Sequence, residues 1–236
     1  MAIKAVLFDL DGTLLPMDLD EFIKVYFKAL AAYLAPHGYD AKQLIGGVWS
    51  GTEAMLKNDG SRTNEQAFWD TFAAVMGEGA RADEPLFERF YTEKFGALRA
   101  ICGFDAGAAS AVSHIRDSGL RVALATNPIF PAVATRQRVQ WAGLQPEDFE
   151  LVTTYENSRF SKPSDGYYRD IAQALGLEPS QCLMVGNDVD DDLSAERVGM
   201  QVFLLTPCLI NKKQKPIGHY PQGGFDHLLA YIEENM

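Results

Sequence analysis

Short apolar runs alternate with stretches of helical character from about residue 104 onward, and this alternation limits the possible folds more than any other feature of the chain. The apolar runs lie at residues 121–126, 149–154, 182–186 and 201–206, and a similar run at residues 3–8 opens the sequence. Each run is mostly apolar, as in strands that are buried on both faces of a sheet. The helical stretches lie at residues 106–117, 131–141, 164–175, 190–198 and 225–234. Strands that alternate with helices predict βα units, so we predict an α/β fold with a parallel sheet.

Residues 17–102 interrupt this pattern, because they contain no convincing buried strand. Their apolar residues recur at helical spacing, for example at Phe22, Val25, Tyr26 and Ala29. Turn-forming stretches such as PHGYD and KNDGS separate the helical segments. We therefore predict a helical domain at residues 17–102, inserted into an α/β core domain formed by residues 1–16 and 103–236.

The charge balance limits the possible partners. The chain carries a formal net charge of −11, whereas nucleic acids and anionic membranes need a basic surface, so we expect neither as a partner. A small anionic substrate stays compatible with this charge, because a bound metal or a few local cations can reverse the field within one cleft.

Two further features concern the location of the protein. No run approaches the ~18 uninterrupted apolar residues of a spanning helix, so we expect no membrane segment. The three cysteines, Cys102, Cys182 and Cys208, are far apart and show no C-x-x-C spacing. A disulfide framework or a zinc site is therefore not expected, and the simplest location is the reducing cytoplasm. Nothing in the sequence indicates an oligomeric state.

Polar and charged residues stand where the predicted strands end. The first strand runs into Asp9-Leu10-Asp11-Gly12, the second ends at Thr126-Asn127, and residues 182–186 run into the acidic stretch GNDVDDD. Lys162, in FSKPS, directly precedes a predicted helix. In an open parallel sheet the ligand crevice lies at the carboxyl ends of the strands, so we expect these side chains to meet in one cleft.

Each of these stretches also has a purely structural explanation. A D-x-D-G sequence is often a turn, Thr126-Asn127 is suited to a turn or a cap, and Lys162 alone would be a solvated lysine. The acids Asp188, Asp190 and Asp192 have the spacing of a calcium loop. Leu193 and Gly199 occupy the positions where that loop needs glycine and glutamate, which excludes an EF-hand. Only the joint occurrence of the stretches, in order at successive strand ends, favours a catalytic site.

The ordered set DLDGT, LATN, SKP and GNDVDDD resembles the motifs of the haloacid-dehalogenase-like (HAD) superfamily of phosphotransferases. The resemblance covers residues 3–16 and about 104–206, the part predicted to form the sheet. It implies a Rossmann-like sheet with the first strand in its centre. It also implies that the helical insertion is a cap domain of the first type.

The resemblance implies a role for each motif residue. Asp9 would be the nucleophile that forms an aspartyl phosphate, and Asp11 the acid that protonates the leaving group and later activates water. Thr126 would donate its hydroxyl to the phosphoryl group, with Asn127 beside it, and Lys162 would hold the nucleophile and the phosphate. Mg²⁺ would be bound by a set of oxygen ligands from Asp9, Asp11 (backbone carbonyl), Asp188 and Asp192, with Asp191 as the alternative to Asp192. Asn187 stands where many members of the superfamily carry an acid.

We therefore predict a Mg²⁺-dependent phosphatase that hydrolyses a small phosphorylated metabolite. A phosphomutase of the β-phosphoglucomutase type shares these residues and is the alternative. Asp11 and Asp188 count against a dehalogenase, and Asp11 counts against a phosphonate hydrolase. A non-catalytic phosphate-binding module is a further alternative. In the cap, Trp49, Lys57 and Arg62 are candidates for substrate contact, although a core tryptophan and solvated basic residues are the favoured explanation for each.

Overall fold

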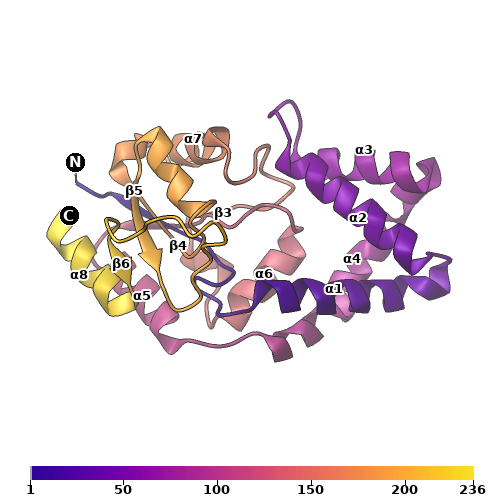
Figure 1. Ribbon diagram of the computed structural model, residues 1–236, viewed down its shortest axis with the longest axis horizontal. Helices are drawn as coiled ribbons and strands as arrows, with labels where there is room; N and C mark the ends of the chain where they lie inside the picture. Colours follow the sequence, from indigo (N-terminus) through magenta and orange to yellow (C-terminus); the bar gives the residue numbers. More distant parts are fainter. Residues whose placement is uncertain (1) are drawn as a thin grey trace.

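The computed structural model describes residues 2–236 and contains a six-stranded, all-parallel sheet beside a separate group of helices (Figure 1). The strands are β1 (Ala5–Phe8), β2 (Arg121–Leu124), β3 (Leu151–Val152), β4 (Cys182–Gly186), β5 (Gln201–Leu205) and β6 (Gln222–Gly223). Their order in the sheet is β3-β2-β1-β4-β5-β6, which places β1 between β2 and β4. The predicted α/β class, with a Rossmann-like parallel sheet and an inserted helical cap, is confirmed.

Strand β1 is apolar throughout because both faces of the sheet are covered. Val6 and Phe8 belong to the hydrophobic cluster that also holds residues of α5 (Ala106–Asp117), α6 (Ala132–Trp141) and α8 (Phe225–Asn235). Ala5 and Leu7, one position out of phase, belong to the cluster that holds residues of α7 (Asp165–Ala174). Alternate side chains of a strand point to opposite faces, so a continuous apolar run is required here.

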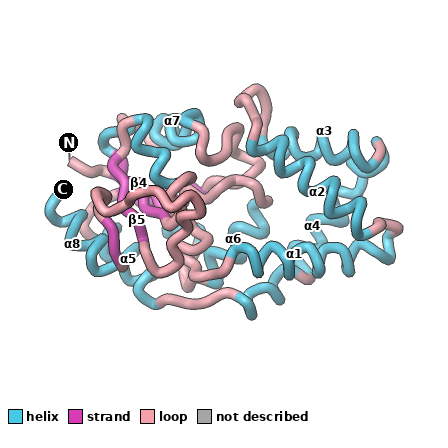
Figure 2. Tube along the Cα trace, viewed as in Figure 1, coloured by secondary structure: helices cyan, strands magenta, loops and turns pink. Residues whose placement is uncertain are grey.

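The segment between β1 and α5 forms the separate helical part of the molecule, and Figure 2 shows no strand in it. Its helices are α1 (Leu19–Leu34), α2 (Ala41–Leu56), α3 (Asn64–Met76) and α4 (Glu84–Glu93). The side chains of Asp18, Asp40 and Thr63 accept backbone N–H groups at the starts of α1, α2 and α3. We continue to propose residues 17–102 as the bounds of the inserted helical domain. None of the helices within residues 2–236 is long and apolar enough to cross a membrane.

Two segments differ from the predicted secondary structure. Residues 190–198 do not form an α-helix; a 3₁₀-helix, η6 (Asp192–Val198), takes most of this range. The reason is a tight turn, in which Asp188 Oδ1 accepts the backbone N–H groups of Asp190 and Asp191. The segment between the predicted strand at residues 201–206 and the predicted helix at residues 225–234 contains an additional short strand, β6, which pairs with β5.

Candidate active site

The three neighbouring strands β2, β1 and β4 bring the predicted motifs together. Their pairing continues past the ends of the strands, since Ala125 N donates to Phe8 O at 2.6 Å and Asp9 N donates to Val185 O at 2.9 Å. Asp9 is thereby fixed at the centre of the carboxyl edge of the sheet. The motif residues that follow β2 and β4 therefore lie on either side of it.

Lys162 joins two buried carboxylates at this edge. Its Nζ donates to Asp9 Oδ1 at 2.8 Å and to Asp192 Oδ1 at 2.6 Å. Burial raises the pKa of Asp9 to about 7; Lys162 opposes this rise, and the negative charges of Asp192 and Asp11 add to it. Burial alone would lower the pKa of Lys162, but Asp192 and Asp9 hold it well above its ordinary value. Lys162 is therefore a buried cation beside the predicted nucleophile.

The turn after β1 is fixed by a hydrogen-bonded side chain from the loop after β4. The Thr13 hydroxyl lies 3.2 Å from Asp9 Oδ2 and 2.9 Å from Asn187 Oδ1, and Asn187 Nδ2 donates to the Cys208 carbonyl at 2.7 Å. Gly12 has a φ of +86°, and a Cβ atom there would overlap with the Asn187 side chain. Asn187 thus holds two loops together at the position where many superfamily members carry an acid.

Arg138 on α6 forms a buried ion pair with Asp11. Its guanidinium also lies 4.5 Å from the centroid of the Phe130 ring, and one of its terminal nitrogens donates to Thr135 Oγ1 at 3.3 Å. Asp11 Oδ1 is buried and has no hydrogen-bond partner within residues 2–236. Asp11 is therefore oriented through one oxygen, while the other is unpaired.

Arg138 is not among the predicted site residues, although the sequence contains a pattern that points to it. Thr135 and Arg138 are three residues apart in a helical stretch, so they share a face with the apolar residues that pack against the sheet. Charged residues on a buried face require a partner.

Two hydrogen bonds fix the backbone carbonyl of Thr126, and the side chain of Asn127 links the loops that contain Lys162 and Asp191. The Thr126 carbonyl accepts hydrogen bonds from Thr153 Oγ1 and from the Tyr167 hydroxyl, both at 2.7 Å. Asn127 Oδ1 accepts the backbone N–H of Lys162 at 3.3 Å, and its Nδ2 lies 3.4 Å from Asp191 Oδ2. Asn127 therefore joins the loop that contains Lys162 to the acidic loop that follows β4.

The acidic loop after β4 uses its carboxylates in different ways. Asp192 is buried and engaged through both oxygens, since Oδ1 accepts from Lys162 and Oδ2 accepts the backbone N–H of Asp188 at 2.9 Å. Gly186 lies beneath it, and a Cβ atom there would overlap with the Asp192 carboxyl group. The carboxylate of Asp191 makes only the long contact with Asn127 among residues 2–236, and burial raises its pKa to about 6, with Lys162 opposing the rise.

The carboxylates of the site can be compared with the ligands that a metal ion requires. Within residues 2–236, no three carboxylate, imidazole or thiol side chains converge as a complete metal cage. Mg²⁺ needs no such cage, because it is commonly held by one or two carboxylates together with waters and phosphate oxygens. Asp9, Asp188 and Asp191 line one cavity and offer hard oxygen ligands, so the donor set fits a hydrated Mg²⁺.

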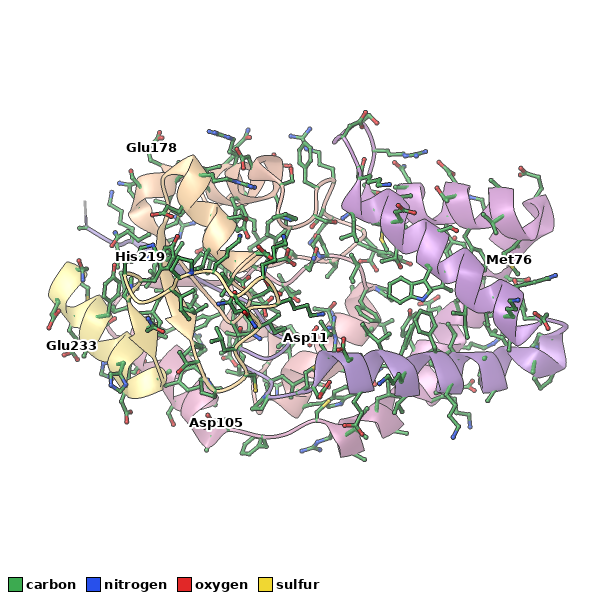
Figure 3. The ribbon with its side chains drawn as sticks, viewed as in Figure 1. Asp11, Met76, Asp105, Glu178, His219 and Glu233 are labelled. Carbon is green, nitrogen blue, oxygen red and sulfur yellow. The ribbon has the colours of Figure 1, made fainter. Side chains whose placement is uncertain are left out.

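A cavity of about 450 Å³ extends from these carboxylates to the inserted helices. Figure 3 places Asp11 beside the start of α1, where the sheet and the helical part meet. The cavity wall includes the motif residues Asp9, Asp11, Thr126, Asn127, Lys162 and Asp188, together with aromatic residues of α1 to α4. A cavity of this kind, with a few polar groups at one end, is the usual form of a small-molecule site.

The cap residues considered from the sequence differ in position. Trp49 lines the cavity. Lys57 is paired with Glu53, and Arg62 with Asp70, and neither basic residue lines the cavity.

Comparison with known proteins points to one family. The family model described as haloacid dehalogenase-like hydrolase matches residues 3–199. The phosphoglycolate phosphatase of Cereibacter sphaeroides is 29% identical over 94% of this chain and 93% of its own. Hexitol phosphatase A of Escherichia coli (strain K12) is 27% identical over 86% of this chain and 83% of its own. The structure of CbbY from Rhodobacter sphaeroides with phosphate superposes with a TM-score of 0.57, at 17% identity, over 98% of this chain and 99% of CbbY.

The family match covers most of the chain and includes every motif that carried the prediction. The predicted family is thereby confirmed: the chain belongs to the haloacid dehalogenase-like hydrolases.

Proposed function

We propose that the protein hydrolyses a small phosphate monoester through an aspartyl phosphate formed on Asp9, with Mg²⁺ as its cofactor. The observation that carries this proposal is the contact of Lys162 Nζ with Asp9 Oδ1, at 2.8 Å, at the end of an accessible cavity. A cation beside a carboxylate at this position offsets the repulsion between that carboxylate and an incoming phosphate dianion. Relatives named as phosphatases support the class of reaction, phosphoric monoester hydrolysis.

In the first step, an oxygen of Asp9 attacks the phosphorus atom, and the bond from phosphorus to the substrate's alcohol oxygen breaks. Asp11 donates a proton to that oxygen, so that the alcohol leaves uncharged. Its unpaired Oδ1 is the oxygen free to carry this proton, because Oδ2 is engaged by Arg138. Thr126 donates its hydroxyl to the phosphoryl group, and Lys162 balances the negative charge.

In the second step, Asp11 takes a proton from a water molecule, and the resulting hydroxide attacks the phosphorus atom of the aspartyl phosphate. The bond between phosphorus and the Asp9 oxygen breaks, which releases inorganic phosphate and restores the Asp9 carboxylate. Each proton that Asp11 gives in the first step is thus recovered in the second.

We assign the Mg²⁺ ligands to Asp9, Asp188 and Asp191, together with the backbone carbonyl of Asp11. When bound, the ion supplies positive charge that neutralises the phosphoryl oxygens during transfer. We prefer Asp191 to Asp192 because both oxygens of Asp192 are already engaged, by Lys162 and by the backbone N–H of Asp188. Asp192 is then a positioning residue for Lys162.

The test is hydrolysis of p-nitrophenyl phosphate by the purified protein. We expect turnover with Mg²⁺, loss of turnover in EDTA, and its return when Mg²⁺ is restored. Asp9→Asn should abolish turnover, whereas Asp170→Asn, which breaks a surface pair with Arg159, should retain it. Substantial turnover by the Asp9→Asn variant would overturn the covalent mechanism. Phosphate release from a monoester without any added bisphosphate separates this function from that of a phosphomutase.

A further inference from the structure

The wall of the active-site cavity is strongly unbalanced in charge. Among the cavity-lining residues that the structure describes, Lys162 is the only basic one, and it is already paired with Asp9 and Asp192. Beyond the catalytic aspartates, the wall carries four further carboxylates, Glu65, Glu84, Glu88 and Glu156. A substrate with a second anionic group would therefore meet repulsion and find no free cation to bind it.

Basic residues near the cavity offset this negative charge only in part, and Arg81 is the one that acts on Glu65. Arg138 lies behind the Phe130 ring rather than in the wall, and its charge is matched by Asp11. Arg62 and Arg81 are half-exposed, and both pair with Asp70 outside the cavity. The field inside the part of the cavity formed by the inserted helices is thus negative.

Three of the four glutamates have no partner of their own. Within residues 2–236, the side chains of Glu65, Glu84 and Glu88 make no hydrogen bond and no ion pair. Burial raises the pKa of Glu65, and the negative charges of Glu156 and Glu84 raise it further, while the positive charge of Arg81 opposes the rise. Glu84 and Glu88 are one helical turn apart on α4, so both can face the same ligand.

Aromatic rings accompany these carboxylates in the wall. Trp49, on α2, is 48% exposed and lies 5.3 Å from Phe27 between ring centroids, while Phe68, Trp69 and Phe87 pack edge-to-face deeper in the cap. The faces of such rings attract cations, most strongly quaternary ammonium groups, and carboxylates nearby add to the attraction. Neutral apolar groups gain from the rings but not from the unpaired glutamates.

We propose that the alcohol part of the substrate carries a cationic ammonium group and no second anionic group, and that this ammonium lies among the aromatic rings and glutamates of the cap. The proposal rests on the phosphatase function proposed above and specifies the substrate class of the same site. The phosphate end of such a substrate binds at Lys162, and its cationic end binds at Glu65, Glu84 and Glu88. The two ends of the substrate thus match the two ends of the cavity in charge.

The test compares phosphate esters that differ mainly in charge. Phosphocholine and 3,3-dimethylbutyl phosphate have the same shape, but only the first is cationic; phosphoethanolamine and propyl phosphate form a smaller pair, and phosphoglycolate is the anionic probe. We expect kcat/KM to be at least tenfold higher for the cationic ester of at least one pair, about 1.4 kcal/mol in transition-state binding, and lowest for phosphoglycolate. Equal or higher values for both neutral esters, or a preference for phosphoglycolate, would overturn the proposal.

Charge-removing variants show whether the glutamates are responsible. Glu84→Gln and Glu88→Gln should each reduce the ratio of kcat/KM between the cationic and neutral esters at least threefold, mainly through KM. Glu78→Gln is the matched control, because Glu78 is an exposed glutamate of the cap outside the cavity wall, and this variant should keep the wild-type ratio. An unchanged ratio in both cavity variants would contradict the proposal.

Failure of this proposal is distinguishable from failure of the proposed function. Hydrolysis of p-nitrophenyl phosphate without preference for the cationic esters would overturn the substrate class alone. Absence of phosphate release from every ester, with Mg²⁺ present, would overturn the phosphatase function and the substrate class together.

Discussion

The guanidinium of Arg138 forms a buried ion pair with the carboxylate of Asp11, which joins helix α6 to the turn after β1. The side chain of Arg138 is 1% exposed and that of Asp11 is 18% exposed. A buried ion pair adds little net stability compared with apolar residues of the same volume, but the loss of one partner leaves a charge without compensation. The position of Asp11, the proposed acid and base, thus depends on Arg138 of helix α6.

Arg138→Met should therefore lower the free energy of unfolding by roughly 3–5 kcal/mol, measured by urea denaturation. The double variant Asp11→Asn, Arg138→Met should lose less stability than Arg138→Met alone, because no charge is then left unpaired. Arg116→Met is the control, since its ion pair with Asp148 lies at the surface and contributes about 1 kcal/mol or less. Equal losses in Arg138→Met and Arg116→Met would contradict this role of the buried pair.

Replacement of the acids after β4 should separate metal binding from the positioning of Lys162. Asp191→Asn should weaken Mg²⁺ binding about tenfold or more, whereas Asp192→Asn should lower kcat with a smaller change in Mg²⁺ affinity, because Asp192 holds Lys162. Isothermal titration with Mg²⁺ and the dependence of activity on Mg²⁺ measure both. Asp190→Asn, which removes a carboxylate paired with Lys213 and Lys215, should change neither quantity. A larger loss of affinity in Asp192→Asn than in Asp191→Asn would reverse the assignment.

Replacement by alanine should be more harmful at Gly12 than at Gly119, a glycine that has the same backbone conformation but no neighbouring side chain. Gly12 and Gly119 both have a φ of +86°, but only at Gly12 would a Cβ atom overlap with another side chain, that of Asn187. Gly119→Ala should cost roughly 1 kcal/mol through backbone strain alone. Gly12→Ala should cost clearly more and should also reduce activity, because Asn187 holds the turn that carries Asp11. Thermal unfolding of the two variants, together with their kcat, tests this difference.

The sheet and the meeting of the motif residues could be predicted because both depend on local patterns. Apolar runs of strand length indicate buried strands, and in a parallel sheet the residues after those runs meet at one edge. Asp9, Asp11, Thr126 and Lys162 each follow a predicted strand or precede a predicted helix. Their convergence therefore required only the order of the elements along the chain.

What could not be predicted depends on contacts between distant segments. The pairing of Arg138 with Asp11 is set by how α6 packs against β1, and no local pattern of the sequence contains that packing. The different tasks proposed for Asp191 and Asp192 rest on a tight turn at Asp188, where the sequence pattern predicts regular helical spacing. The acidic character of the cavity arises from glutamates of α3, α4 and the loop after β3, which are far apart in the sequence.

The metal-free protein should become more stable as the pH falls from 8 to 6. Burial raises the pKa of Asp9 to about 7 and that of Asp191 to about 6, from an ordinary value of 3.8. As the pH falls from about 8 to 4, the folded protein therefore binds protons that the unfolded chain does not bind, so the free energy of unfolding rises as the pH falls through this range. In EDTA, the thermal midpoint should rise by several degrees, at roughly 2–4 °C for each kcal/mol in a chain of this size.

Asp9→Asn provides the control for this pH dependence, because an amide at position 9 does not titrate. This variant should lose most of the rise in the thermal midpoint between pH 8 and pH 6, and at pH 8 it should be more stable than the metal-free wild type. Mg²⁺ should have the opposite dependence, stabilising the wild type more at pH 8 than at pH 6, because protons compete with the ion for the same carboxylates. A thermal midpoint in EDTA that falls steadily from pH 8 to pH 6, or an equal rise in Asp9→Asn, would show that the buried carboxylates do not control the stability of the site.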